Sequence, residues 1–126
     1  AIQLHGDETP EQCDYGRLEV WKAVRVRDEE SVRLAEGWPA ARILFDAYDD
    51  KTYGGTGKVF DWELLRTFKD KRRMVLAGGL SPENVAAAAL KVRPYAVDVS
   101  SGVETDGRKD YEKVKQFIEN ARRALE

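Results

Sequence analysis

The chain has 126 residues, a length that fits one domain of ordinary size. Hydrophobic residues make up 42% of the sequence and charged residues 35%, which is typical of a folded protein with a well-solvated surface and excludes disorder. Because 21 basic residues stand against 23 acidic ones, the net charge of −2 favours neither a nucleic acid nor an anionic membrane as a partner.

The cysteine content and the lack of long apolar runs indicate the cellular compartment in which the protein is expected. The one cysteine, Cys13, excludes an internal disulfide framework and is typical of a reducing compartment. No apolar run approaches about 18 residues, and no basic segment followed by an apolar one opens the chain. We therefore expect a cytoplasmic protein without a membrane span or a signal peptide.

Short apolar runs alternate with helical segments along the chain. The predicted strands span residues 2–5, 20–26, 43–45, 74–77 and 95–99. The predicted helices comprise a short one starting at Thr9, residues 28–36, residues 61–68, a helix capped by Ser81, and residues 111–125. This alternation predicts an α/β fold with a parallel sheet. No linker or charge block divides the chain, so residues 1–126 are expected to form a single domain.

Local signals mark several helix ends and faces. Asp28 is a favourable N-cap, and Gly37 follows the end of the same helix. Pro82 suits the first position of the helix that Ser81 is predicted to cap. The last helix is amphipathic, and its predicted inner face consists of Val114, Phe117, Ile118, Ala121 and Leu125.

Two of the predicted strands, at 74–77 and 95–99, run directly into glycine turns. Glycine lets backbone N–H groups approach an anion, and parallel strands end at the same edge of a sheet. Each turn alone would also suit a plain loop, but the two together predict one shared phosphate site. The residues expected to form it are Gly78, Gly79, Ser100, Ser101 and Gly102.

Three further side chains at or near strand ends are candidates for chemistry. Asp46 ends the third strand, a position from which barrel enzymes present catalytic groups, although it also suits a turn-initiating aspartate. His5, the only histidine, ends the first strand, where it either faces a ligand or has a structural role. On the last strand, period-two alternation sends the side chain of Asp98 to the face opposite to its neighbours, where it suits a hydrogen-bonded interior residue.

The glycine-rich segment at residues 53–58 is not a nucleotide-binding loop. A Walker motif needs four residues between its first glycine and Gly-Lys-Ser/Thr, whereas only two separate Gly54 from Gly57, and Lys58 precedes a valine. Three glycines in a long loop are typical of a mobile active-site flap, and we interpret the segment in this way.

Two other residues invite a functional interpretation. Lys22, in the second strand, either faces the site or is solvated. Cys13 follows a proline-started helix rather than ending a strand, so we expect a structural thiol on the outer layer and not a catalytic base.

Six motifs carry a resemblance to a known family. They are IQLHGDE at residues 2–8, KAV at 22–24, LFD at 44–46, YGGTGKVFDW at 53–62, AGGLSPENV at 77–85 and VDVSSGVE at 97–104. In this order they resemble the phosphoribosylanthranilate isomerase family of tryptophan biosynthesis, whose members are (β/α)8 barrels. The resemblance implies a phosphorylated small-molecule substrate and an intramolecular isomerisation, the Amadori rearrangement of N-(5-phosphoribosyl)anthranilate, without a cofactor or metal.

The resemblance also implies roles for single residues. Asp46 matches the position of the family's general acid, which protonates the ribose ring oxygen while a base removes the C2′ proton. The family carries a histidine at the position of His5. Asp98 is then expected to contact the ribose or the amine of the substrate.

The resemblance covers the family's fourth to eighth strands only. Its first three strands have no counterpart here, among them the Lys-Ile-Cys-Gly segment whose cysteine resembles the catalytic base. Because a complete barrel usually needs ~200 or more residues, we expect a truncated (β/α)8 barrel that is essentially inactive alone and self-associates through exposed edge strands. Two alternatives stay open: a stable non-catalytic subdomain or phosphate-binding scaffold, and a flavodoxin-like domain.

Overall fold

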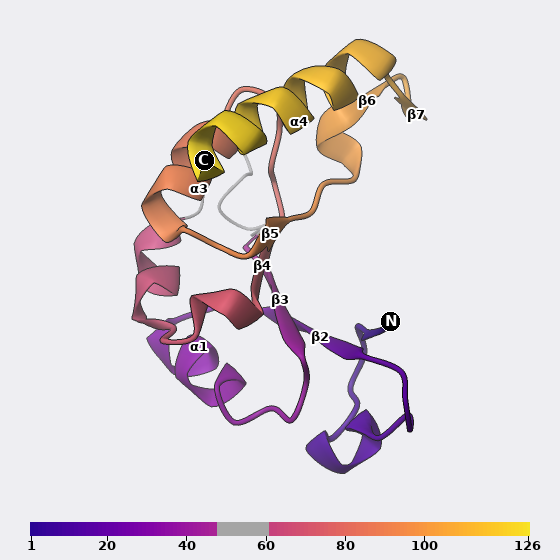
Figure 1. Cartoon of the computed structure of the whole chain (residues 1–126), viewed down its shortest axis with the longest axis vertical. Helices are drawn as coiled ribbons and strands as arrows, with labels where there is room; N and C mark the ends of the chain where they lie inside the picture. Colours follow the sequence, from indigo (N-terminus) through magenta and orange to yellow (C-terminus); the bar gives the residue numbers. More distant parts are fainter. Residues whose placement is uncertain (48–60) are drawn as a thin grey trace.

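The computed structural model describes residues 1–47 and 61–126 and has an α/β fold (Figure 1). Its main sheet contains five parallel strands, which are β1 (Ile2–Leu4), β2 (Val20–Arg25), β3 (Arg42–Asp46), β4 (Met74–Ala77) and β5 (Ala96–Val97). Their order in the sheet is β1-β2-β3-β4-β5. The predicted fold class and strand order are confirmed, whereas the flavodoxin-like alternative is wrong because that fold has the order 2-1-3-4-5.

The strand register brings the carboxyl ends of the strands to one edge of the sheet. Asp46 pairs with Arg25 on one side and with Ala77 on the other. Strand β5 is shorter than the predicted span of 95–99, although its ladder continues as the Asp98 N–H donates to the Leu76 carbonyl at 2.8 Å. Beyond this bond the chain leaves the sheet and enters the second glycine turn.

The remaining elements connect and cover the strands. The α-helices are α1 (Glu29–Ala35), α3 (Val85–Val92) and α4 (Tyr111–Leu125). The 3-10 helices are η1 (Pro10–Cys13), η2 (Trp62–Thr67), η3 (Lys71–Arg73) and η4 (Ser101–Val103). An antiparallel hairpin, β6 (Glu104–Thr105) with β7 (Arg108–Lys109), was not predicted.

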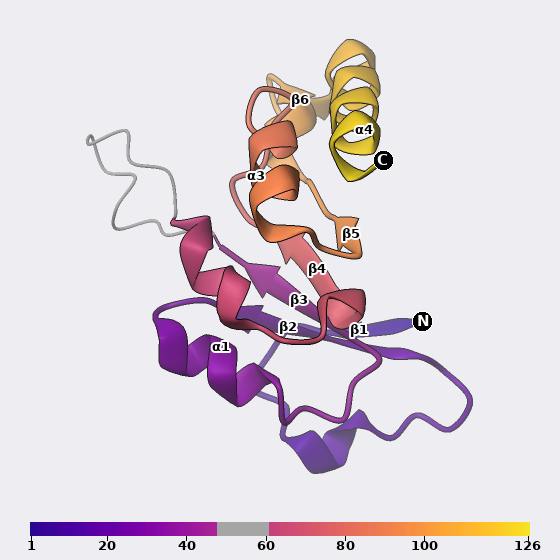
Figure 2. The ribbon, with the colours of Figure 1, turned by 60° about the vertical axis from the view of Figure 1, so that its left-hand side comes forward.

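Helices α1, η2, α3 and α4 lie in this order in an arc along one side of the sheet (Figure 1). The turned view shows α3 beside α4, far from α1 (Figure 2). The larger hydrophobic core fills the space between this arc and the sheet. Within it, Phe45 of β3 meets Phe68 edge-to-face, with ring centroids 5.0 Å apart.

The opposite face of the sheet carries a smaller apolar cluster. Leu44, Val75 and Ala77 are its buried members, and partly buried residues of β2 and β5 pack against them. Because side chains alternate along a strand, Ile43 and Phe45 point to the helices while Leu44 and Asp46 lie on this second face. This second face, which none of the helices in the described residues covers, therefore carries Asp46 at the carboxyl ends of the strands.

Two predicted helix features need correction. Helix α3 starts at Val85 rather than just after Ser81, because the Ser81 carbonyl accepts from the Asn84 and Val85 N–H groups and residues 82–84 form a turn. Asn84, and not Ser81, is the N-cap residue. The predicted helix at 61–68 is the 3-10 helix η2, a common form for so short a segment.

Helix α4 agrees with its predicted bounds but not with the whole of its predicted inner face. Phe117 and Ala121 are buried, and Ala124 completes this face. Ile118 is 43% exposed, because it lies beside the buried face of the helix and points toward the edge of the sheet at β5. There it lines a mainly apolar groove of about 540 Å³ together with Val97 and other residues of β5 and α4.

Candidate functional site

A cavity of about 560 Å³ lies at the carboxyl ends of the strands. Every site residue predicted from the sequence lines it: His5, Asp46, Gly78, Gly79, Asp98, Ser100, Ser101 and Gly102. Gln3, Ala23, Leu44, Ala77, Leu80 and Val99 complete the wall. The structure thus brings together residues that are spread over most of the described sequence.

The first glycine turn has a backbone that favours glycine. Gly78 and Gly79 have φ values of 85° and 65°, in the left-handed region. The Asn84 side chain holds the turn from both sides, because its Nδ2 donates to the Gly79 carbonyl at 2.9 Å and its Oδ1 accepts from the Ser81 N–H at 2.8 Å. The turn is therefore fixed before a ligand arrives.

The two glycine turns are in direct contact at Gly102. A Cβ atom placed on Gly102 would lie 1.8 Å from the Leu80 carbonyl oxygen. No side chain fits between the backbones, so glycine is needed here for close approach rather than for a positive φ. This contact makes the two turns one continuous wall of the cavity.

Asp46 is held at the end of β3 by its neighbours on both sides. Its carbonyl accepts from the Val26 N–H at 3.1 Å, and the next residue, Ala47, donates its N–H to the Ala77 carbonyl at 2.9 Å. Asp46 is half-buried, whereas Asp98 and His5 are exposed to the open cavity. Among these titratable side chains, Asp46 is thus the most shielded from water.

Lys22 does not line this cavity, and it is not solvated either. Its side chain is only 5% exposed, and its Nζ donates to the Gly6 carbonyl at 2.8 Å and to Glu8 Oε2 at 3.0 Å. The ammonium also lies 5.0 Å from the ring centroid of Trp38. The predicted solvated lysine is therefore wrong, because Lys22 is buried and holds the backbone that follows His5. Its electrostatic effect on the strand-end cavity stays a prediction.

Glu8 completes this arrangement. Its carboxylate accepts from the Gly6 N–H as well as from Lys22, and these contacts hold its pKa below the usual value, with the Lys22 hydrogen bond as the largest cause. Lys22 and Glu8 line a second cavity of about 760 Å³, which shares His5 and Ala23 with the first. Sequence reasoning missed this ion pair because nothing local links two residues in different elements.

Lys109 is a second cation that sequence reasoning missed. It lies on β7, and its Nζ donates to the Ser100 carbonyl at 2.8 Å and to Glu104 at 2.6 Å. The Asp106-Gly107 dipeptide could have revealed the hairpin, because positive φ values at both residues, 51° and 75°, are those of a type I′ turn.

The remaining sequence predictions lie away from this cavity or outside the described residues. Cys13 is buried in η1, with its Sγ 4.0 Å from the Thr9 carbonyl, which agrees with a structural thiol. The predicted flap at residues 53–58 lies outside the described residues. In the described parts of the chain, no group of three or more His, Cys, Asp or Glu residues is placed to hold a metal ion. No helix there is long and apolar enough to cross a membrane.

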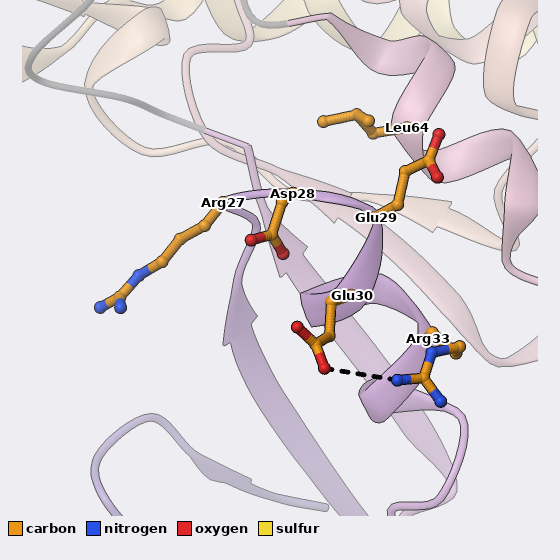
Figure 3. Close-up of a pocket in the computed structure, with 6 residues that line it drawn as sticks. All are labelled: Arg27, Asp28, Glu29, Glu30, Arg33 and Leu64. Carbon is orange, nitrogen blue, oxygen red and sulfur yellow. Dashed lines mark hydrogen bonds and ion pairs between the residues drawn. The ribbon is translucent and has the colours of Figure 1, made fainter.

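A further depression of about 710 Å³ lies beside the start of α1 and carries none of the predicted site residues (Figure 3). Its wall consists of charged side chains of α1 and of the two residues before it, together with Leu64. Asp28 is engaged as the N-cap, and Glu30 pairs with Arg33 at 3.4 Å. Three of its five charged side chains thus already have partners near the start of α1, and no predicted site residue lies here, so the strand-end cavity is the better candidate.

Comparisons with known proteins agree on one family. The family model described as N-(5'phosphoribosyl)anthranilate (PRA) isomerase matches residues 1–120. The N-(5'-phosphoribosyl)anthranilate isomerase of Acetivibrio thermocellus is 49% identical over 135 residues, covering 98% of this chain and 62% of the relative. That of Geobacter sp. strain M21 is 51% identical, covering 97% of this chain and 60% of the relative. The chain therefore spans about three fifths of the length of these relatives.

Solved structures give the same result. The phosphoribosyl anthranilate isomerase of Thermotoga maritima superimposes with a TM-score of 0.82 at 48% identity, over 95% of this chain and 60% of that one. A second isomerase structure, in complex with reduced 1-(o-carboxyphenylamino)-1-deoxyribulose 5-phosphate, gives a TM-score of 0.76 at 42% identity, over 95% of this chain and 58% of that one.

Proposed function

The chain belongs to the phosphoribosylanthranilate isomerase family, and on that premise we propose that it supplies the phosphate site and the general acid of that reaction. The observation that carries the proposal is the shared cavity, in which the strand-end acid Asp46 and both glycine turns face one space. A cavity at the carboxyl ends of parallel strands is where barrel enzymes bind their substrates. The relative solved with a reduced deoxyribulose 5-phosphate compound supports a sugar phosphate as the ligand.

The two glycine turns bind the phosphate in this proposal. Gly78, Gly79 and residues 100–102 line the cavity, and we propose that their backbone N–H groups donate to the anion. All of them lie in the described part of the chain, and the Asn84 side chain orders the first turn without a ligand. Phosphate binding therefore depends on this chain alone.

Asp46 delivers the proton in the rearrangement. Its carboxyl group protonates the ribose ring oxygen, the C1′–O bond breaks, and a base then removes the C2′ proton, so that an aminoaldose becomes an aminoketose. The product is an isomer of the substrate, and the step needs no oxidant or reductant. Asp46 is the most shielded from water of the candidate acids in this open cavity, which is the environment a general acid needs. Asp98 and His5 contact the ribose and the amine.

The base comes from outside this chain. The only cysteine, Cys13, lies buried in η1 and does not line the strand-end cavity. We propose that the chain corresponds to the fourth to eighth βα units of the barrel and needs the first three for turnover. Loss of a general base lowers the rate by ~10² to 10⁴, and the open cavity further weakens substrate positioning.

An NMR titration with ribose 5-phosphate tests the site separately from the chemistry. We expect the amide resonances of Gly79 and Ser101 to shift on addition of ligand, with weak affinity. Unchanged resonances at both amides, together with shifts elsewhere, would place the anion at another site and contradict the proposal.

A second candidate function is a phosphate-binding subdomain that has no catalytic role. The two glycine turns, which line one cavity and meet at Gly102 within the described residues, support this alternative. It predicts the same phosphate binding but no turnover when the remaining βα units are supplied. Complementation therefore separates the two functions.

A further inference from the structure

Among the described residues, no lysine or arginine lines the strand-end cavity. Its acidic lining residues are Asp46 and Asp98, and His5 lies on the same wall. A carboxylate in the same cavity opposes the binding of a phosphate dianion, because like charges repel. Backbone N–H groups carry only partial charges, so a full positive charge close to the turns would strengthen binding considerably.

Lys109 is a cation that hydrogen-bonds directly to a residue of the cavity wall. Its Nζ donates to the Ser100 carbonyl at 2.8 Å and lies 3.4 Å from Ser100 Oγ. The β6–β7 hairpin places the lysine there, and the Asp110 cap at the start of α4 follows directly. The position of Lys109 is thus set by folded elements on both sides.

The contact with Ser100 connects the lysine to the anion site. The Ser100 carbonyl belongs to the same peptide group as the Ser101 N–H, so an ammonium on the oxygen polarises the group and makes the N–H a stronger donor. The ammonium also lies on the acceptor side of the Ser100 hydroxyl, whose hydrogen stays available to the anion.

Glu104 acts against this effect. Its carboxylate accepts from Lys109 Nζ at 2.6 Å and is 25% exposed, so it partly neutralises the ammonium near Ser100. Because the Lys109 side chain is itself 56% exposed, solvent screens its charge and the net effect is severalfold rather than many orders of magnitude.

We propose that Lys109, acting through Ser100, sets the affinity of the cavity for dianionic phosphate monoesters and that Glu104 opposes it. This inference rests on the proposed phosphate site and adds a positioning residue that determines which phosphate charge state is preferred. Lys109 contacts the wall of the site and not the reacting atoms.

The test is an NMR titration of the 126-residue chain with ribose 5-phosphate at pH 7.5, where the phosphate is mainly dianionic, and at pH 5, where it is mainly monoanionic. We expect Lys109→Met to weaken binding by about three- to tenfold at pH 7.5 and by less at pH 5. Lys109→Arg keeps the charge and is expected to restore most of the affinity. Glu104→Gln leaves the ammonium unopposed and is expected to tighten binding by about two- to threefold.

The opposite signs of the two substitutions separate an electrostatic role from a structural one. If the Lys109–Glu104 pair only held the loop in shape, both substitutions would weaken binding, and the inference would be overturned. Equal affinity of Lys109→Met and the unchanged chain would also overturn it while leaving the phosphate site intact. Absence of binding by the unchanged chain would overturn both the site and the inference.

Lys91→Met is the matched control. Lys91 pairs with Glu63 at 3.1 Å, is 38% exposed, and does not line the strand-end cavity. This substitution also breaks an ion pair and removes one positive charge from the chain. We expect its affinity for ribose 5-phosphate to equal that of the unchanged chain, and an equal loss in both lysine variants would show that net charge alone is responsible.

Discussion

Asp46 combines the position, the shielding and the family match that the proposed acid needs. Asp46→Asn keeps the shape of the side chain but cannot deliver a proton. In the isomerase complemented with the first three βα units, we expect kcat to fall by ~10² or more while binding of a substrate analogue changes little. Steady-state kinetics check this result.

Asp49→Asn and Asp50→Asn are the controls for Asp46, since both aspartates follow it closely in the sequence and lie outside the described residues. Full turnover in Asp46→Asn would contradict the assignment. A matching loss in either control would instead move the acid to the segment that follows Asp46.

The ion pair of Lys22 with Glu8 predicts a pH dependence of stability. The pKa of Glu8 is lower in the folded chain than its ordinary value of 4.5, mainly because of the Lys22 hydrogen bond. Its contribution to stability is therefore complete above pH 4.5 and is lost as the pH falls through the lower folded pKa. We expect Glu8→Gln to lower the urea midpoint at pH 7 and to differ less from the unchanged chain as the pH approaches 3.

Urea unfolding followed by circular dichroism from pH 7 down to pH 3 measures this difference. Glu30→Gln is the control, because its partner Arg33 is 70% exposed and such surface pairs contribute little. A constant difference between Glu8→Gln and the unchanged chain across the whole range would show that the ion pair is not its source.

Site residues next to a strand end could be predicted from the sequence. Residues whose contacts come from distant parts of the chain could not. His5, Asp46 and the glycine turns were predicted because strand periodicity and a break to glycine are visible in neighbouring residues. The contacts of Lys22 with Gly6 and Glu8 join separate elements. Only the pairing of β1 with β2 brings Lys22 close to this turn, so the sequence pattern could not separate a buried lysine from a solvated one.

The contact between the two glycine turns leaves no space for a side chain at Gly102. Gly102→Ala places a Cβ against the Leu80 carbonyl, and the fold can accept it only if one turn moves. We expect a loss of about 1 to 3 kcal/mol in the free energy of unfolding, the usual result of overpacking. We also expect a large loss of affinity for ribose 5-phosphate.

Gly37→Ala is the control for Gly102→Ala. A Cβ at Gly37 would lie 3.6 Å from the nearest backbone oxygen, an ordinary contact, and the site lies elsewhere. We expect its phosphate affinity to be unchanged in the same titration. Normal stability and affinity in Gly102→Ala would show that the turns are not locked together.

Elements with strong local signals were predicted to within a residue, and the others were not. Strand β4 and helix α4 agree with their predicted bounds. The four-residue length and the glycine pair that follows mark the apolar run as a strand, and the amphipathic period marks the helix. The β6–β7 hairpin was missed because each of its strands has only two residues, too few for a visible alternation. The late start of α3 depends on the Asn84 side chain, whose bonds to the turn replace the predicted Ser81 cap.

Both edges of the main sheet lack a further strand within the described residues. β1 forms one edge and β5 the other, and an apolar groove that includes Ile118 lies beside β5. Unpaired N–H and C=O groups at such edges promote pairing with other chains. We expect concentration-dependent association in sedimentation velocity, or rapid amide exchange in β1 and β5. A monomer at all concentrations with strong amide protection in both strands would contradict this expectation.

The most direct test is the isomerase activity of this chain, measured alone and after addition of a fragment with the first three βα units of a longer relative such as the Thermotoga maritima enzyme. We predict turnover alone to be lower by ~10² to 10⁴ than in the mixture, because in our proposal the added fragment supplies the base. We also predict that Asp46→Asn abolishes the activity gained on mixing. Turnover by the chain alone at the rate of the mixture would contradict the proposal that the base comes from outside. No turnover in the mixture, with the two fragments shown to associate, would contradict the catalytic proposal and favour the second candidate function, a phosphate-binding subdomain without a catalytic role.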